Sequence, residues 1–245
     1  MIRNFINLTE AELDRPIYRV FSSKWFFEMA RNEEISLRQP SKWHDPFENF
    51  MLNATGERSD GSKFTVAFKD HLYGQCWTTK RESDAIWRIY SPKSDGVKVK
   101  TTIRKLFYAL YSQAGSFKDI SCFIGKVQYA NKKKLIEQLS DPDLMRSRLI
   151  DSTGYGQAET LLFKRIAFSH EQEVRLIYNS PTNLKTEWFQ FKFNPRELFD
   201  QVVFDPRMDY HRYKTDKERL INEFGFKMPI IKSSLYKIPE LSFRM

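Results

Sequence analysis

Short stretches of the chain alternate apolar and polar residues, and in others the apolar residues recur at helical spacing. Ile17–Phe21 alternates with a period of two, which is typical of a half-buried strand. Apolar residues in Thr102–Gln113 fall on one face of a helix. Further strands are predicted at Ile35–Leu37, Tyr73–Thr79, Gly96–Lys100, Phe123–Tyr129, Glu173–Tyr178, Phe189–Phe193, Val202–Phe204 and Pro229–Tyr236. Further helices are predicted at Ser23–Ala30, Ser83–Tyr90, Lys132–Leu139, Gln157–Ala167 and Thr215–Phe224.

This order of elements lacks the regular strand–helix–strand rhythm of a doubly wound fold. It therefore predicts the α+β class, with a mixed or split antiparallel sheet and flanking helices. Glycine is scarce, with 9 residues, and no repeat or low-complexity linker divides the sequence. We expect a single domain over residues 1–245, with one longer loop at Ser140–Gln157.

The charge of the chain is basic. Its 245 residues contain 40 Lys and Arg against 31 Asp and Glu, which gives a net charge of +9. A positive surface permits binding of nucleic acid or another polyanion but does not establish it. The chain is also rich in aromatic residues, at 15%, which offers material for stacking as well as for a core.

Several classes of protein are disfavoured. The longest apolar runs, such as Leu106–Tyr111, are far shorter than the roughly 20 residues that span a bilayer, so no membrane partner is expected. The opening residues Met1–Phe5 do not resemble a signal peptide, and two cysteines, Cys76 and Cys122, form no disulfide framework. We therefore predict a cytoplasmic location.

Familiar catalytic motifs are absent from the sequence. It contains no dinucleotide-binding or phosphate-binding glycine loop and no nucleophile elbow. No two histidines stand at the spacing of metal ligands, and no metal site is predicted.

Arg19 lies on a predicted strand between apolar neighbours, just before a helix. An arginine in that position needs a carboxylate, a phosphate or backbone oxygens as partner. A ligand-binding role and a structural or solvent-exposed role both remain open.

Trp43–Phe50 concentrates polar groups among aromatic residues. His44, Asp45 and Glu48 together offer a hard-metal site or an acid and a base. We favour a structural clasp at this turn, in which Asp45 and Glu48 accept backbone N–H groups or hold an arginine.

The third polar segment is Phe168–Tyr178. On a strand, Glu171, Glu173 and Arg175 would share one face. Two carboxylates so close together should raise one pKa, and Arg175 or Arg19 would relieve the repulsion. Such a pair could stabilise an oxocarbenium-like centre or hold ribose hydroxyls, whereas a solvated charged strand face is the simpler alternative.

A set of motifs follows in order between Ile17 and Phe204. They are Tyr18-Arg19, Asp45-Pro46-Phe47-Glu48, Gln75-Cys76-Trp77-Thr78, Trp87-Arg88-Ile89-Tyr90, Gly96–Val99, Lys164 and Glu171-Gln172-Glu173-Val174-Arg175. This order resembles a bacterial family known as domain-of-unknown-function family 2971. His44 stands where that family usually has Asn, and Phe168 where it has Trp, which leaves the carboxylates and arginines in place.

The order of an arginine strand, a helix, a short strand and a late Glu-x-Glu strand also resembles ADP-ribosyltransferases of the Arg–Ser–Glu kind. That resemblance implies NAD as the substrate, with Arg19 binding its phosphates or ribose. It implies Glu173 as the carboxylate that stabilises the oxocarbenium, and Glu171 as the group that orients the acceptor. Thr78-Thr79, after Trp77, is a candidate for the hydroxyl-bearing strand that supports the nicotinamide, although the sequence has no clean Ser-Thr-Ser there. Rings that could stack on a nicotinamide or base are Tyr18, Trp43 and Trp77.

Two hypotheses of function follow. The first is an NAD-dependent ADP-ribosyltransferase-like enzyme that modifies nucleic acid or protein, in a toxin or phage-defence setting. The alternative is a non-catalytic nucleic-acid-binding or protein-binding module, whose basic face includes Lys132, Lys133, Lys134, Lys164 and Arg165. A metal-dependent hydrolase that uses His44, Asp45 and Glu48 is a distant third.

Overall fold

The computed structural model describes residues 3–43, 45–49, 52–53, 55–57, 60–66 and 68–239. The chain divides into two compact units, and each is assembled from segments far apart in sequence. The first comprises Met1–Ile17, Glu34–Lys80 and Thr102–Phe193, and the second comprises Tyr18–Glu33, Arg81–Thr101 and Asn194–Met245. The single domain over residues 1–245 stays a prediction.

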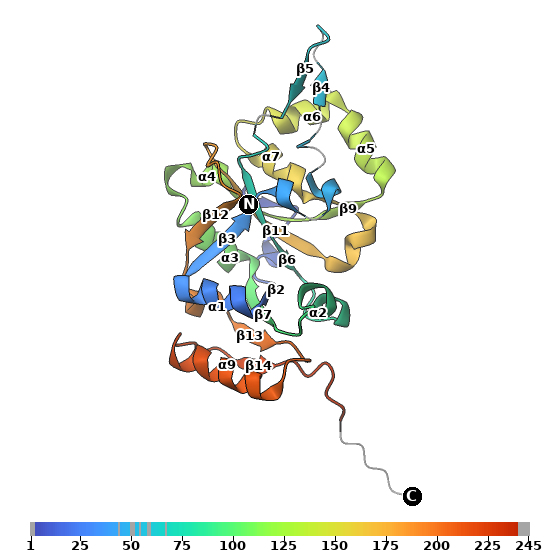
Figure 1. Ribbon diagram of the computed structural model, residues 1–245. Coiled ribbons are helices and arrows are strands. Elements are labelled where there is room, and N and C mark those ends of the chain that lie inside the picture. Colours follow the sequence, from blue (N-terminus) through green and yellow to red (C-terminus); the bar gives the residue numbers. More distant parts are fainter. Residues whose placement is uncertain are drawn as a thin grey trace, which may run out of the picture. The chain divides into compact units, whose positions relative to one another are not determined.

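A mainly antiparallel sheet organises the first unit. Strand β11 (Glu173–Asn179) lies between β6 (Leu72–Thr78) and β8 (Cys122–Lys126) and is antiparallel to both. Figure 1 labels β11 and β6 next to each other. Strand β1 (Phe5–Ile6) pairs in parallel with β8, while β3 (Glu34–Arg38) pairs with β6 and with β12 (Trp188–Lys192). Because β11 has a neighbour on each side, it is buried along almost its whole length.

Two small strand pairs and several helices complete the first unit. Strands β9 (Gln128–Ala130) and β10 (Phe163–Arg165) pair in parallel, and β4 (Thr55–Glu57) and β5 (Lys63–Thr65) form an antiparallel pair. Its α-helices are α3 (Ile103–Tyr111), α4 (Lys118–Ser121), α5 (Lys132–Ser140), α6 (Pro142–Leu149) and α7 (Tyr155–Glu159). Its 3-10 helices are η1 (Glu10–Glu12), η2 (Pro40–Lys42), η3 (Pro46–Asn49), η4 (Gly115–Phe117), η5 (Thr160–Leu162) and η6 (Ile166–Glu171).

Apolar residues from the sheet and the helices form a common core in the first unit. Phe123 and Ile177 on adjacent strands pack with Ala158 of α7 and with Leu161 and Leu162 of η5. Burying a side chain of this size stabilises the fold by roughly 1.5–3 kcal/mol. This packing fixes the segment that leads from α7 into β10.

The second unit has its own strands and helices. Its strands are β2 (Pro16–Ser22, which starts in the first unit), β7 (Gly96–Thr102, which ends there), β13 (Gln201–Phe204) and β14 (Ile230–Lys232). They run in the order β2-β7-β13-β14, with β13 antiparallel to β7 and parallel to β14. The helices are α1 (Ser23–Asn32), α2 (Asp84–Tyr90), α8 (Pro195–Leu198) and α9 (Tyr210–Asn222).

Local capping chemistry explains where several helices start. The hydroxyl of Ser83 accepts the N–H of Ile86 at the start of α2. Helix α1 begins at Ser23, and Ser22 caps it, because its hydroxyl accepts the N–H of Trp25. Such a side-chain cap satisfies one of the amide groups that the first helical turn leaves without a partner.

The predicted α+β class is confirmed, with a mainly antiparallel sheet and flanking helices. The predicted single helix over Gln157–Ala167 is wrong, because this stretch is divided among α7, η5, β10 and η6. Its middle becomes a strand by pairing with β9, a tertiary contact that helical spacing cannot reveal. The predicted loop at Ser140–Gln157 is also corrected, since it contains α6, with Asp141 as its cap.

Across the described part of the chain, every helix is too short or too polar to cross a bilayer.

Candidate functional site

A buried lysine on β10 lies among carboxylates in the first unit. Lys164 stands opposite Tyr129 in the parallel pair of β9 and β10, and its side chain is only 5% exposed. A buried ammonium group costs several kcal/mol unless carboxylates and hydrogen bonds compensate it. The groups around Lys164 therefore decide whether it can remain charged.

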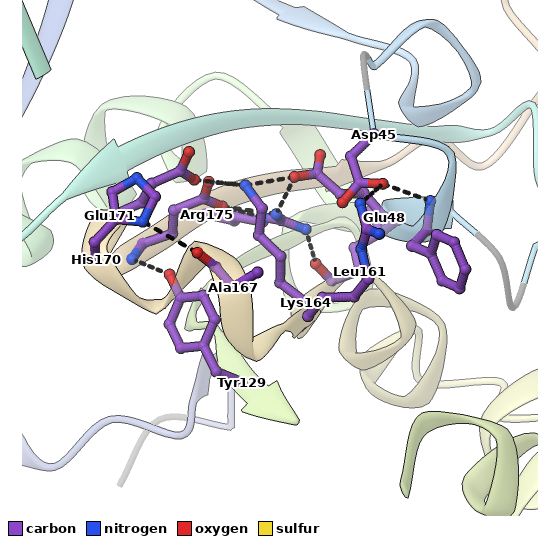
Figure 2. Close-up of polar contacts among 12 residues, drawn as sticks. Asp45, Glu48, Tyr129, Leu161, Lys164, Ala167, His170, Glu171 and Arg175 are labelled. Atoms are coloured by element: carbon purple, nitrogen blue, oxygen red, sulfur yellow. Dashed lines mark hydrogen bonds and ion pairs between the residues drawn. The ribbon is translucent and has the colours of Figure 1, made fainter. Parts of the chain in front are cut away.

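Three carboxylates surround this amine. Its Nζ atom lies 2.6 Å from Oε1 of Glu48, 2.5 Å from Oε2 of Glu171 and 2.8 Å from Oε1 of Glu173. Figure 2 shows Glu48 and Glu171 directed toward Lys164, each joined to it by a dashed contact. The three acids come from η3, from the end of η6 and from the first residue of β11, so the amine ties three elements together.

Arg175 on β11 supplies the second cation. Its Nε and Nη2 lie 2.7 Å and 2.6 Å from Oε2 of Glu173, and Nη2 lies 3.2 Å from Oε1 of Glu48. Its Nη1 donates to the backbone oxygen of Leu161 at 2.6 Å, and its guanidinium lies 4.8 Å from the ring centroid of Trp43. We call these five ionisable residues the Lys164 cluster: Glu48, Lys164, Glu171, Glu173 and Arg175.

The register between β6 and β11 holds the two acids of the Glu-x-Glu motif. Glu173 pairs with Thr78, and the Thr78 hydroxyl donates to the backbone oxygen of Glu171 at 2.5 Å. Gln172, between the acids, has a φ of 46°, in the left-handed region, and its backbone oxygen accepts the N–H of Thr79. The strand therefore starts at Glu173, while Glu171 approaches Lys164 from the turn before it.

The cluster separates the pKa values of its two adjacent acids. Burial and the neighbouring Glu173 together raise the pKa of Glu171 to about 7, against the opposing effect of Lys164. Burial also disfavours charged Glu173, but Arg175 and Lys164 hold its pKa well below the ordinary value. Burial works against charged Lys164 too, yet the acids hold its pKa above the ordinary value. The prediction that one carboxyl pKa rises is confirmed, as is relief by Arg175.

A second ion pair, between Asp45 and Arg165, joins the segment around η3 to β10, as the pair of Glu48 and Lys164 does. Asp45 accepts the N–H of Phe47 at 3.0 Å and Nη2 of Arg165 at 3.0 Å. The Arg165 guanidinium lies 4.5 Å from the ring centroid of Phe47 and 5.2 Å from that of Phe168. With Glu48 bound to Arg175, the predicted clasp that holds arginines is confirmed.

The residues expected to contact NAD are placed as follows. On β2, Tyr18 lies against Lys98 and Arg19 packs over Phe21, so the two neighbours use opposite faces of their strand. Tyr18 and Trp77 are both buried, at 6% and 2% exposed, and the indole N–H of Trp77 donates to Gln75. Tyr18 and Arg19 belong to the second unit, whereas Trp77, Thr78 and both acids belong to the first.

The basic residues of the alternative hypothesis separate into two groups. Lys132, Lys133 and Lys134 are exposed in the first turn of α5. Lys164 is buried in the Lys164 cluster, and Arg165 is half-buried against Asp45. A phosphate could reach the three exposed lysines directly, whereas Lys164 is enclosed by carboxylates.

The second unit contains a smaller buried group around another lysine. Nζ of Lys98 donates to the backbone oxygen of Arg81 at 2.7 Å and to Oε1 of Glu82 at 3.1 Å. The same carboxylate oxygen accepts Nε1 of Trp87 at 2.8 Å and the Ser233 hydroxyl at 2.7 Å. We call Lys98, Glu82, Trp87 and Ser233 the Lys98 cluster.

No group of three or more metal-ligating side chains suited to an ion occurs within the described residues. His44, one of the three residues of the metal-hydrolase hypothesis, lies outside them. The other two, Asp45 and Glu48, are bound to cations, which is the chemistry of an ion-pair network.

Sequence reasoning missed two contributors to the site. The Tyr129 hydroxyl accepts the backbone N–H of Glu173 at 2.9 Å, and burial raises the pKa of Tyr129 to about 12. The Leu161 backbone oxygen binds Arg175. Neither has a local sequence signal, because both contacts depend on how η5 and β9 pack against β11.

The family comparison covers part of the chain. Residues 86–176 match the family described as "Protein of unknown function (DUF2971)". The predicted resemblance to that family is thus confirmed over a segment that contains four members of the Lys164 cluster: Lys164, Glu171, Glu173 and Arg175. No curated protein matches the chain.

Among solved structures, the chain is similar to DarT from Thermus sp. 2.9. The complex with NAD+ has a TM-score of 0.40 at 10% identity, over 90% of this chain and 96% of that chain. The complex with ADP-ribosylated ssDNA gives 0.40 at 10% identity, over 89% and 93%. The complex with carba-NAD+ gives 0.39 at 11% identity, over 92% and 96%.

Proposed function

We propose that this chain is an ADP-ribosyltransferase-like enzyme that transfers the ADP-ribosyl group of NAD to a nucleic acid or protein acceptor. The observation that carries the proposal is the pair of acids at the start of β11. One carboxyl group, on Glu171, has a pKa near neutrality beside another, on Glu173, that is held as an anion. Perturbed and opposed pKa values of neighbouring acids are typical of sites that move protons or stabilise positive charge.

The chemistry fits this pair. When the bond between nicotinamide and ribose breaks, its electron pair passes to the ring nitrogen and positive charge develops on the ribose. A nearby carboxylate stabilises such an oxocarbenium-like centre. We assign that role to Glu173 and the orientation of the acceptor to Glu171. Arg19 is the proposed anchor for the NAD phosphates, because a guanidinium binds phosphate oxygens in pairs.

Three of the other residues act through protein contacts in this proposal. Thr78 supports the site by binding the backbone oxygen of Glu171. Trp77 is buried and hydrogen-bonded to Gln75, and Tyr18 is buried beside Lys98. The proposal therefore does not assign either ring to stacking on the nicotinamide.

The direct test is to incubate the purified protein with NAD labelled in the adenine, in the presence of single-stranded DNA, RNA or cell extract. We expect nicotinamide release and transfer of label, both lost in Glu173→Gln. Glu28→Gln, an exposed acid on α1, is the matched control and should behave as wild type. Folding of each variant is checked by thermal unfolding. If folded Glu173→Gln retains the activity, the catalytic assignment is wrong.

The same variants test the toxin or phage-defence setting. Modification of an essential nucleic acid or protein would slow growth when the chain is expressed in bacteria. We expect growth inhibition by the wild type and by Glu28→Gln and none by Glu173→Gln. Equal growth with all three chains would remove the toxin part of the proposal.

The second candidate function is a non-catalytic nucleic-acid-binding module. It is favoured by the exposed Lys132, Lys133 and Lys134, which add their charge to the positive end of α5. Binding through such lysines weakens steeply with salt because counterions are released from the phosphates. Salt-sensitive binding that survives Glu173→Gln but is lost with these lysines would support this function.

A further inference from the structure

The charges of the Lys164 cluster do not balance. Three carboxyl groups face one ammonium and one guanidinium group, all within 3.2 Å of an opposite charge. If every group were ionised, a buried negative charge would remain. Excess buried charge is costly, and proteins usually remove it by moving a proton. One bound proton makes the cluster neutral.

The contacts indicate which acid holds that proton. Both oxygens of Glu173 face cations, Oε1 toward Lys164 and Oε2 toward Arg175. Oε1 of Glu48 is shared between the same two cations. Glu171 meets one of these cations, Lys164, through Oε2, and its side chain is the most exposed of the three acids, at 11%. Glu171 therefore loses least when it is neutral.

The other charged and titratable groups beside the cluster are Arg165, Asp45, His170, Tyr129 and Cys76, which stands opposite Arg175 on β6. Arg165 is paired with Asp45, so these two charges cancel. His170, next to Glu171, is exposed and its Nδ1 contacts the backbone oxygen of Ala167 (Figure 2). Tyr129 faces the backbone N–H of Glu173 through its hydroxyl, and a phenol whose pKa is raised to about 12 is neutral at pH 7. From β6, the group that contacts Glu171 is the uncharged hydroxyl of Thr78.

We infer that Lys164 is a positioning residue that keeps Glu173 charged, leaves the single proton of the cluster on Glu171, and draws Glu48 of η3 into the same site. Glu48 is thus the third acid of the site, and its charge is the reason that a proton is needed. This inference deepens the proposed function, because it states which of the two acids is charged when the enzyme works. Its first test does not depend on NAD.

The test is titration of the carboxyl carbons by NMR in glutamate-labelled protein, with Glu171 assigned through Glu171→Gln. Two variants should move the Glu171 midpoint in opposite directions. Glu48→Gln leaves two acids for two cations, and we expect the midpoint to fall by one pH unit or more. Lys164→Met leaves three acids for one cation, and we expect it to rise, with Lys164→Arg returning it toward wild type. Glu28→Gln should have no effect.

A merely structural role for Lys164 would change stability without opposite shifts of the midpoint. An unmoved midpoint in Glu48→Gln overturns the inference, as do shifts of the same sign in Glu48→Gln and Lys164→Met. If Lys164→Met does not fold, Glu48→Gln alone decides, since its amide has the shape of the carboxylate it replaces.

Activity separates this inference from the proposed function. If NAD is cleaved, the pH profile of nicotinamide release should move in Glu48→Gln in the same direction as the Glu171 midpoint. Titration as expected without any NAD cleavage would contradict the proposed function and support the inference. NAD cleavage with a Glu171 midpoint that Glu48→Gln does not move would support the function and overturn the inference.

Discussion

The two units each bury a lysine, but they compensate its charge differently. Lys164 is surrounded by three carboxylates, which hold its pKa above the ordinary value. Lys98 has one carboxylate, a backbone oxygen and the rings of Tyr18 and Trp87, and burial lowers its pKa. Both side chains are 5% exposed, so burial alone does not explain the difference.

The ratio of acids to cations decides which group of a buried cluster titrates. Around Lys98, burial disfavours charged Glu82, but hydrogen bonds from Ser233 and Trp87 and the charge of Lys98 lower its pKa. Around Lys164 the acids outnumber the cations, and the excess appears as a raised pKa of Glu171. The Lys98 cluster is thus a balanced structural pair, whereas the Lys164 cluster contains a group that can exchange a proton near pH 7.

We expect the largest difference in stability between the two clusters when each buried lysine is replaced by methionine. We expect Lys164→Met to lower the free energy of unfolding by about 3–5 kcal/mol at pH 8, because it leaves uncompensated buried carboxylates. Lys98→Met should cost less, roughly 1–3 kcal/mol, since Glu82 keeps two hydrogen bonds and is 25% exposed. Urea unfolding measures both, and equal losses would contradict the distinction.

The pH dependence of stability should differ between wild type and Glu171→Gln. Folding raises the pKa of Glu171 from 4.5 to about 7, so the folded state binds more protons than the unfolded state in that range. This stabilisation is complete below pH 4.5 and is lost as the pH rises through 7. Relative to Glu171→Gln, wild type should lose up to about 3 kcal/mol between pH 4.5 and 8.

The pKa of the neighbouring acid, Glu173, shifts in the opposite direction, and its effect on stability falls at lower pH. The pKa of Glu173 is lowered, so its contribution to stability is present above pH 4.5 and is lost as the pH falls toward its lower folded pKa. It therefore adds little slope between pH 5 and 8. A pH-independent stability difference between wild type and Glu171→Gln would show that Glu171 titrates normally.

Removing the Thr78 hydroxyl tests how much β6 contributes to holding Glu171 in the Lys164 cluster. Thr78→Val deletes the hydrogen bond to the Glu171 backbone oxygen, and we expect a loss of about 1 kcal/mol in unfolding free energy. Thr79→Val, which removes a hydroxyl on an exposed contact to Gln172, is the matched control and should cost less. A larger loss in the control would place the important contact outside the cluster.

The smallest effect on stability is expected from the exposed lysines of α5. Replacing Lys132, Lys133 and Lys134 by alanine removes exposed charges. The ion pair that involves them joins Nζ of Lys133 to Oε1 of Glu137 at 3.9 Å, and both side chains are exposed. The thermal midpoint should stay close to wild type. Gel-shift binding to single-stranded DNA should weaken only if the basic-face hypothesis is correct.

Local patterns predicted much of the fold. The strand expected at Glu173–Tyr178 is β11, which runs from Glu173 to Asn179, and the clasp at Asp45 and Glu48 binds Arg165 and Arg175 as expected. These succeed because alternation, turn chemistry and the need of a buried arginine for a partner are properties of short segments.

The position of Lys164 could not be read in the same way. In the sequence it belongs to a basic stretch with Arg165, and its burial depends on the parallel pairing of β9 and β10, which no local pattern reveals. The left-handed turn at Gln172 is not predicted from the sequence either. It places Glu171 before the strand, whereas the alternation pattern places it on the strand with Glu173 and Arg175. A cluster assembled from four elements is therefore visible only in the fold.

The most direct measurement is the titration of the Glu171 carboxyl carbon in the folded wild-type protein between pH 4 and 9. Burial and the neighbouring Glu173 raise the pKa of Glu171 to about 7, and we expect the midpoint there. A midpoint below about 5, close to the ordinary value of a glutamate, would contradict it.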